Sequence, residues 1–207
     1  MSAPVTAVVI LNLKPDAAIE QPAHDVSEIF AKQEGFQRLS WGRWEESPDK
    51  VQMLIDWDNL ESHRKFENSG ADYKAVLGAL KPVLVAPPSM YHIHFDPHPI
   101  SAVLEAPVVA LTTFYSLSAT FETDIAKLLS YLEKADGFLA VSHGFIDEEL
   151  AKEDGDEKGK AYLAAIGWSS VDAHVKATTT KEIADAIQLT SGGSKHVEVR
   201  HVKFKTE

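Results

Sequence analysis

The sequence predicts an α+β protein built from two tandem repeats of the order β-α-β-β-α-β, whose antiparallel sheets pack face to face. Three observations lead to this prediction. Short sequence segments recur in the same order in both halves of the chain. Each half alternates branched apolar runs, typical of strands, with segments of helical periodicity. The first strand is apolar on both of its faces, so its sheet needs a cover on each side.

The repeat is clearest in "GFQRLSWG" and "GFLAVSHG", which share Gly, Phe, Ser and Gly at the same spacing. Three further pairs of segments correspond in the same way, with offsets between 101 and 111 residues. The four pairs are residues 6–13 with 107–114, 35–42 with 137–144, 55–63 with 166–174, and 92–95 with 201–204. A run of ordered matches with small changes in offset indicates a duplicated chain with insertions in its loops.

The largest change in offset falls at the acidic segment 147–160. This segment is rich in carboxylates and poor in apolar residues, so we expect a solvated hairpin loop rather than a metal site. The ligand spacing of a calcium loop is absent from it.

Each half contains the signals for four strands and two helical segments. The Asp58 and Glu61 pair is typical of a capping box that opens the second helix, and Ser69-Gly70 is expected to interrupt that helix. A linker with several prolines separates the halves, which are predicted at residues 1–96 and 107–207 with the linker at 97–106. The expected elements of the first half are strands at 8–13, 38–46, 50–57 and 90–95 and helices at 23–32 and 58–80.

The first strand fixes how the halves are expected to meet. Val8 and Ile10 point to one face, whereas Val9, Leu11 and Leu13 point to the other. Two helices cover only one face of a small sheet, so the other apolar face needs a partner. A duplicated chain carries that partner as its second repeat.

Composition excludes several classes of protein. The chain of 207 residues is 44% hydrophobic and 25% charged, as in ordinary globular proteins, and its net charge of −11 argues against nucleic-acid binding. No apolar run is long enough to span a membrane, and the absence of cysteine excludes disulfides and thiolate chemistry. No glycine-rich phosphate loop is present. We therefore expect a cytoplasmic protein with no nucleotide cofactor, no nucleic-acid partner and no membrane partner.

Three features of the first half occur in order: Gly35-Phe36 after the first helix, the strand end "IDWD" at 55–58, and a helix that begins near Leu60. On these features the chain resembles the dimeric α/β-barrel superfamily, and within it the antibiotic-biosynthesis-monooxygenase type in a tandem form. The resemblance implies two ferredoxin-like repeats that form an intramolecular dimeric α/β barrel. It also implies a pocket between each sheet and its own helices, no cofactor, and a monomer with an internal pseudo-dimer; a further homodimer is left open.

Asn12, His92 and His94 are the candidate catalytic residues. The resemblance places Asn12 where several relatives carry a catalytic or substrate-positioning Asn; the alternative is an Asn that bonds to a loop. His92 and His94 share one face of the last strand of the first repeat, where one of them could act as a general base. Two alternatives stay open for these histidines, namely a metal pair, for which no third ligand is evident, and a structural role.

Five further residues are candidates for substrate binding, because aromatic and imidazole rings suit flat ligands. Packing in the core is the alternative for each of them, and the recurrence of His63 as His174 favours structure. The five are Trp41, Trp57, His63, Tyr115 and His143.

Haem degradation is not expected. The haem-degrading relatives use an Asn, a Trp and a His, and only Asn12 matches that set. Phe66 occupies the Trp position, and the His position falls near Ala75 or Val76.

Two functions follow as hypotheses. The first is a cofactor-independent monooxygenase or cyclase that acts on a small aromatic or polyketide-like molecule, with Asn12 holding the substrate and His92 or His94 taking its proton. The second is a non-catalytic stress-response or small-ligand-binding protein that has kept the shape without the chemistry.

Overall fold

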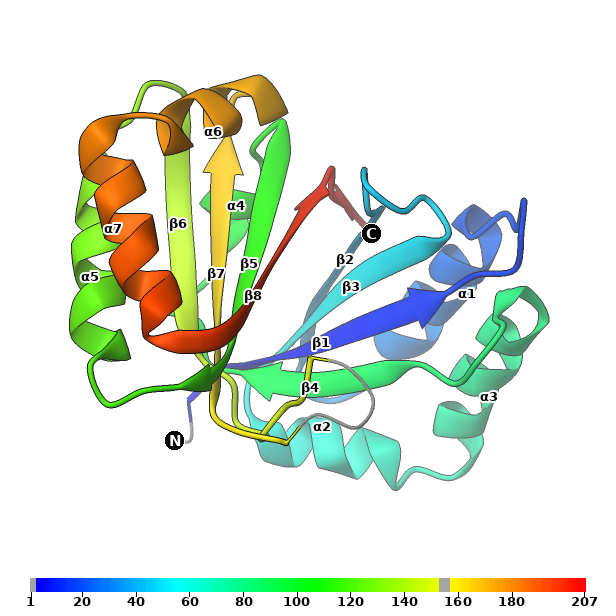
Figure 1. Ribbon diagram of the computed structural model, residues 1–207. Helices are drawn as coiled ribbons and strands as arrows, with labels where there is room; N and C mark the ends of the chain where they lie inside the picture. The colour runs from blue at the N-terminus through cyan, green and yellow to red at the C-terminus, as the bar shows by residue number, and fades with distance from the viewer. Residues whose placement is uncertain (1–2, 153–156) are drawn as a thin grey trace. The chain divides into compact units, whose positions relative to one another are not determined.

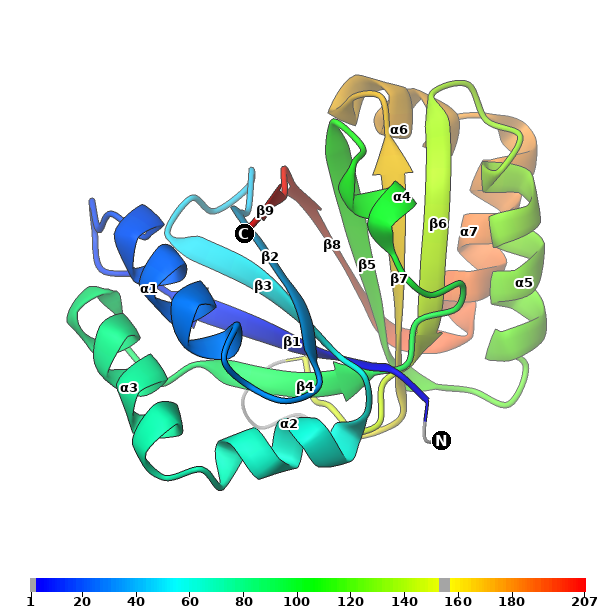
Figure 2. The same cartoon turned by 180° about the vertical axis from the view of Figure 1, so that it is seen from behind.

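The computed structural model describes residues 3–152 and 157–207. The chain divides into two compact units (Figures 1 and 2). Unit 1 contains residues up to His94 together with Phe204–Glu207, and unit 2 contains Phe95–Lys203. The last few residues of the chain thus belong to the same unit as its start.

Unit 1 consists of an antiparallel sheet with helices packed on one face. Its strands have the order β4-β1-β3-β2-β9, and α1 and α3 lie against the same side of the sheet (Figures 1 and 2). The elements are β1 (Val5–Asn12), α1 (Glu20–Phe30), β2 (Phe36–Arg43), β3 (Lys50–Trp57), α2 (Leu60–Glu67), α3 (Ala71–Leu80), the short 3-10 helix η1 (Lys81–Val83), β4 (Ser89–Ile93) and β9 (Lys205–Thr206).

Unit 2 repeats this arrangement with α5 and α7 on one face of its sheet (Figure 2). The strand order β6-β7-β5-β8 is the order of β2, β3, β1 and β4 in unit 1. The elements are α4 (Ser101–Leu104), β5 (Val108–Leu117), α5 (Phe121–Leu132), β6 (Phe138–Phe145), β7 (Ala161–Trp168), α6 (Val171–Thr178), α7 (Lys181–Gly192) and β8 (Ser194–Val202).

The predicted fold class is confirmed. Both units have the ferredoxin-like order of elements, and all the ladders between neighbouring strands are antiparallel in the described residues. The face-to-face packing of the two sheets stays a prediction. The linker contains the short helix α4, and the acidic segment is closed by a bridge between Leu150 and Gly159, while residues 153–156 lie outside the described residues.

The repeated glycine has a steric cause. Gly35 follows α1 with φ +83°, a conformation that favours glycine, and Gly137 follows α5 with the same φ. A Cβ on Gly35 would lie 2.3 Å from Oδ1 of Asp58, and one on Gly137 would lie 2.6 Å from Cβ of Ala173. Each glycine therefore turns the chain and lets the start of the following helix, α2 in unit 1 and α6 in unit 2, pack close to it.

The N-cap of the second helix of the first repeat lies one residue later than expected. This N-cap is Asn59, whose side-chain oxygen accepts a hydrogen bond from the backbone N–H of Ser62 at 2.9 Å. The capping box predicted at Asp58 is therefore wrong, because the following Asn takes the cap position. The predicted break at Ser69-Gly70 is confirmed, since α2 ends at Glu67 and α3 begins at Ala71.

Strand register corrects one offset of the repeat. Trp57 pairs with Val5 in unit 1, and Trp168 pairs with Val108 in unit 2. Val108 is thus the counterpart of Val5, which gives an offset of 103 for the first strands instead of 101. Asn12 therefore corresponds to Tyr115, and not to Thr113 as an offset of 101 would give.

The two faces of β1 have different environments. Val9 and Leu11 belong to the apolar core with α1 and α3, so this is the helix-covered face. The opposite face carries buried polar groups: the Thr6 hydroxyl donates to Oδ1 of Asp56 at 2.6 Å, and Arg38 forms an ion pair with the other carboxylate oxygen. Asp56 is 1% exposed, so these partners offset the cost of burying its charge.

No helix among the described residues is long and apolar enough to cross a membrane.

Candidate functional site

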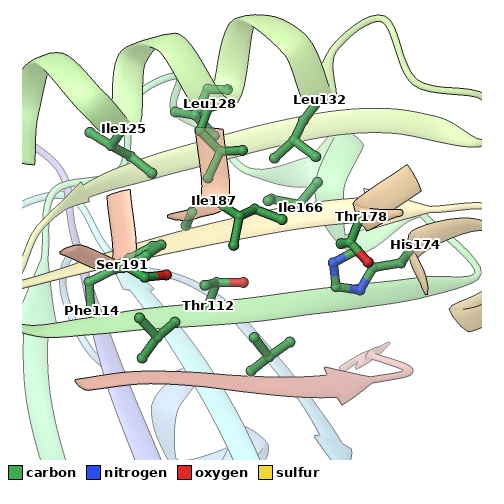
Figure 3. Close-up of a pocket in the computed structure, with 14 residues that line it drawn as sticks. Thr112, Phe114, Ile125, Leu128, Leu132, Ile166, His174, Thr178, Ile187 and Ser191 are labelled. Carbon is green, nitrogen blue, oxygen red and sulfur yellow. The ribbon is translucent and has the colours of Figure 1, made fainter. Parts of the chain in front are cut away.

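Unit 2 contains a cavity of about 340 Å³ between its sheet and the helices α5, α6 and α7 (Figure 3). Most of its wall is aliphatic, and four polar side chains interrupt that surface, namely those of Thr112, His174, Thr178 and Ser191. The remaining lining residues are Phe114, Ile125, Leu128, Leu129, Leu132, Ala164, Ile166, Ile187, Val197 and Val199. A cavity of this size and lining suits a small, mainly apolar ligand.

Unit 1 contains the corresponding cavity, with a volume of about 270 Å³. Strand register and helix position make most of the two walls equivalent; for example, Val9 corresponds to Thr112 and His63 to His174. The lining residues are Val9, Val26, Phe30, Met53, Ile55, His63, Phe66, Tyr73, Val76, Leu77, Leu80, Pro87, Pro88 and Met90. The duplication has therefore kept a cavity in each repeat.

A pair of histidines lies at one end of the unit 2 cavity, and one of them, His174, lines it. Nδ1 of His174 lies 2.8 Å from Nε2 of His201, which is hydrogen-bond distance. His201 stands opposite Ala110 on β5, where the small alanine side chain leaves room for the imidazole ring. The His174 ring is also stacked on Trp168, with centroids 5.0 Å apart and an angle of 27°. These contacts orient His174 at the cavity wall.

His174 is neutral at pH 7. Burial, and to a smaller extent the charge of neighbouring His201, lower the pKa of His174 to about 4. A neutral imidazole carries one N–H and one lone pair. When Nδ1 holds the proton and donates it to His201, Nε2 of His174 has the lone pair and can accept a proton from a ligand.

The same histidine pair occurs in unit 1. Nδ1 of His63 lies 2.9 Å from Nε2 of His92, and the His63 ring packs on Trp57 with centroids 5.1 Å apart. Burial, then His92 and then Arg64 lower the pKa of His63 to about 4. His63 is only 3% exposed, whereas His174 is partly exposed, so the unit 2 histidine is the more accessible of the two.

The tryptophans beside these histidines are packing residues. Trp57 and Trp168 are both fully buried, and within the described part of the chain neither indole N–H has a hydrogen-bond partner. Trp57 meets Phe36 edge to face, and Trp168 meets Phe138 in the same way. Neither tryptophan is among the residues that line the cavities.

The hydroxyl groups of the unit 2 cavity differ in availability. The Thr178 hydroxyl donates to the backbone oxygen of Val175 at 2.8 Å. The hydroxyls of Thr112 and Ser191 form no hydrogen bond with another described protein group. In Figure 3, Thr112 lies between Ser191 and His174 along the cavity. A ligand in this space would meet two hydroxyls and one imidazole.

The structure does not bring the predicted catalytic residues into one cavity. His92 lies on the helix-covered face of the unit 1 sheet, opposite Ala7. Asn12 points to the other face of β1, because it alternates with the helix-facing Leu11. His94 hydrogen-bonds through Nδ1 to the backbone oxygen of Pro4 at 2.6 Å. The described residues contain no cluster of three potential metal ligands.

Among the five residues predicted to bind substrate, His63 lines one of these two cavities, and the other four are not among the described residues that line either of them. Trp41 is buried, and its indole N–H donates to Glu207 at 3.1 Å. The Tyr115 hydroxyl donates to Glu198 at 3.4 Å on the face of the unit 2 sheet opposite the cavity; burial and then Glu198 raise its pKa.

His143 shares a hydrogen bond of 2.6 Å with the hydroxyl of Tyr162, outside the residues that line the cavity. Burial lowers the pKa of His143, although Asp96 and Glu133 oppose the shift. His143 and Tyr162 therefore form a further titratable pair in unit 2, outside the cavity that His174 lines.

Sequence reasoning missed Thr112, Ser191 and the His174–His201 pair. One signal for the histidine pair was present: His63 and His92 both recur, as His174 and His201, in the matched segments. Two histidines that recur together suggest that they are partners. Nothing in the sequence pattern marks Thr112 or Ser191, because a hydroxyl on a strand or a helix is common on any surface.

Neither a family model nor a curated protein matches this sequence. Solved structures share its fold over the full length. A monooxygenase candidate from Fusobacterium nucleatum subsp. nucleatum has 12% identity and a TM-score of 0.68, with coverage of 100% of this chain and 94% of its own. An anthrone oxidase-like protein has 12% identity and a TM-score of 0.68, with coverage of 99% of this chain and 94% of its own. A chlorite dismutase candidate has 12% identity and a TM-score of 0.61, with coverage of 99% of this chain and 96% of its own.

These similarities confirm the predicted resemblance at the level of the fold. The solved structures that share the tandem arrangement are described as monooxygenase-like, anthrone oxidase-like or chlorite dismutase-like proteins. Their sequence identity of 12% to this chain gives no information about its substrate.

Proposed function

We propose that the unit 2 cavity is the active site of a cofactor-independent monooxygenase or cyclase for a small aromatic or polyketide-like molecule. The observation that carries this proposal is a neutral histidine, His174, at the wall of an apolar cavity with its second nitrogen held by His201. Such an arrangement holds an unprotonated imidazole, whose lone pair can accept a substrate proton, in a space shielded from water.

His174 acts as the general base in this proposal. Its Nε2 accepts the substrate proton while its Nδ1–H donates to Nε2 of His201. The hydrogen bond keeps His174 in the required tautomer. The hydroxyl of Thr112 or Ser191 donates to the substrate oxygen on which negative charge develops.

The deprotonated substrate then has two routes. In a monooxygenase, it reduces dioxygen: the reacting CH₂ carbon loses both hydrogens and gains one oxygen atom as a carbonyl, and the second oxygen atom leaves as water. In a cyclase, the carbanion attacks a carbonyl carbon of the same molecule, one C–C bond forms, and the new alkoxide takes a proton. Both routes need the same first step, and neither needs a group that the chain lacks.

Oxygen uptake with anthrone tests the proposal. We expect His174→Gln to lower turnover by about 100-fold or more, because general-base catalysis supplies a factor of that size. His63→Gln is the matched control, since it changes the equivalent histidine of unit 1 and should leave turnover close to that of the unmodified protein. Unchanged turnover in His174→Gln would exclude this site. The catalytic roles suggested for Asn12, His92 and His94 stay predictions.

One observation favours a non-catalytic ligand-binding protein as the second candidate. The histidine pair occurs in both units, and in unit 1 it is nearly inaccessible at 3% exposure of His63. A pair that serves packing would be kept in both repeats. Binding of aromatic compounds without oxygen uptake or cyclisation, in the protein with all its histidines, would support this candidate.

A further inference from the structure

The floors of the two cavities differ at several equivalent positions, for example Met90 in unit 1 and Val199 in unit 2, and one cross-strand pair among them changes polarity as well as size. In unit 2, Thr112 of β5 stands directly opposite Ala164 of β7. In unit 1, the corresponding positions are Val9 of β1 and Met53 of β3, which also stand directly opposite each other. All four residues line their cavities, because opposite residues of an antiparallel pair point to the same face.

This exchange changes both the size and the polarity of the floor. Methionine fills space that alanine leaves open, in line with the smaller volume of about 270 Å³ in unit 1 against about 340 Å³ in unit 2. Threonine and valine have nearly the same shape, so the exchange at this position replaces a methyl group by a hydroxyl. The hydroxyl of Thr112 bonds to no other described group, so a ligand can use it.

The rest of each wall strengthens the contrast. Ser191 places a second hydroxyl on the unit 2 cavity, whereas the polar side chains that line the unit 1 cavity are those of His63 and Tyr73. Tyr73 packs edge to face on Phe66. A hydroxyl or carbonyl group buried without a hydrogen-bond partner is costly, so the part of the unit 1 floor formed by Val9 and Met53 disfavours such a group in its ligand.

We propose that this cross-strand pair sets the ligand of each cavity, so that the chain has two sites of different selectivity. Thr112 and Ala164 adapt the unit 2 cavity to an aromatic ligand that carries a hydroxyl or keto oxygen. Val9 and Met53 adapt the unit 1 cavity to a smaller aromatic hydrocarbon without such a group. The assignment for unit 2 rests on the proposed function, because the oxygen held by Thr112 is the one that gains charge when His174 takes the proton.

Naphthalene and 1-naphthol are suitable probes, since they differ by a single hydroxyl group. The chain contains three methionines, and two of them, Met53 and Met90, line the unit 1 cavity. Methionine methyl labelling therefore reports binding in unit 1 by NMR. Labelled isoleucine methyl groups of Ile125, Ile166 and Ile187 report binding in unit 2.

In the unmodified protein, naphthalene should shift the methionine signals and 1-naphthol should preferentially shift the unit 2 isoleucine signals. Thr112→Val should weaken 1-naphthol binding in unit 2 about fivefold, the usual value of one hydrogen bond, and leave naphthalene binding there unchanged. Thr112→Ser, which keeps the hydroxyl, should restore 1-naphthol binding. Ala164→Met should weaken the binding of both probes in unit 2.

The reverse exchange tests unit 1. In the Val9→Thr, Met53→Ala double variant, Met90 still reports on the cavity, and 1-naphthol should bind there at least fivefold more tightly than before. Far-UV circular dichroism and urea midpoints show whether the variants are folded.

Equal affinity of both probes in both cavities, or no change of 1-naphthol affinity in folded Thr112→Val, would overturn the inference. These measurements need no turnover. If His174→Gln keeps full oxygen uptake while the two cavities still discriminate between the probes, the proposed reaction fails and the binding selectivity stands. If His174→Gln loses oxygen uptake but the two cavities bind both probes equally, the proposed reaction stands and the proposed binding selectivity fails.

Discussion

Nδ1 of His174 lies 2.8 Å from Nε2 of His201, and this hydrogen bond joins the α6 helix to the β8 strand across the end of an apolar cavity. The two residues lie on elements that are separated by α7 in the chain, and the fold brings them together. Because His63 and His92 are paired in the same way in unit 1, the contact is a property of the repeat.

Replacement of His201 should change the titration of its partner. In His201→Phe, the pKa of His174 should rise from about 4 toward 6.5, because the neighbouring charge that lowers it is removed. Burial is the larger cause of the shift and persists, so the value should stay below 6.5. The measurement is an NMR titration of the His174 ring protons, with His143→Gln as a control that leaves this titration unchanged. A pKa that stays near 4 in His201→Phe would mean that the two rings are not electrostatically coupled.

Acid should destabilise the protein through His63. The folded-state pKa of His63 is about 4 and its ordinary value is 6.5, so between these values the unfolded chain binds a proton that the folded chain does not. Above pH 6.5 this effect vanishes; as the pH falls from 6.5 to 4 it removes roughly 3 kcal/mol of stability. The free energy of unfolding by urea, measured at a series of pH values, should fall less steeply in His63→Gln. Parallel curves for the two proteins would contradict the assignment.

Two glycines with positive φ angles should respond differently to substitution. Gly35 has φ +83° and a Cβ there would lie 2.5 Å from Cβ of Ser62, whereas Gly70 has φ +71° and no neighbour within 4 Å of its Cβ position. Gly70→Ala should lower the free energy of unfolding by roughly 1–3 kcal/mol, through the backbone conformation alone, because φ +71° with ψ −71° is sparsely populated by residues with a Cβ. Gly35→Ala should lower the free energy of unfolding by about 2 kcal/mol more than Gly70→Ala does, because α2 must move away from the new Cβ. Urea unfolding gives both values, and equal losses would show that the close approach is relaxed at no cost.

Much of the fold could be predicted from the sequence. Strand β3 was expected at its observed bounds, and the helix break after α2 follows from Ser69-Gly70, because these are local signals. The helix cap and the offset of the first strands were wrong, since Asn59 competes with Asp58 for the cap and register depends on the partner strand.

The candidate site was much harder to predict. Which face of β1 is covered by helices depends on packing, and it separates Asn12 from His92. Whether a threonine such as Thr112 lines a cavity depends on how completely its neighbours fill the space around it. That packing involves many side chains that are far apart in the chain, so a local sequence pattern does not reveal it.

The sequence by itself determined the duplicated order of elements and the residue types that recur, Trp57 with His63 and Trp168 with His174, because periodicity, turn residues and repeats act over short stretches. The tertiary structure decided which histidines are partners and placed the hydroxyls of Thr112 and Ser191 on the wall of the unit 2 cavity. Hydrogen bonds between distant strands and helices, and the volume left over after packing, exist only once the chain has folded.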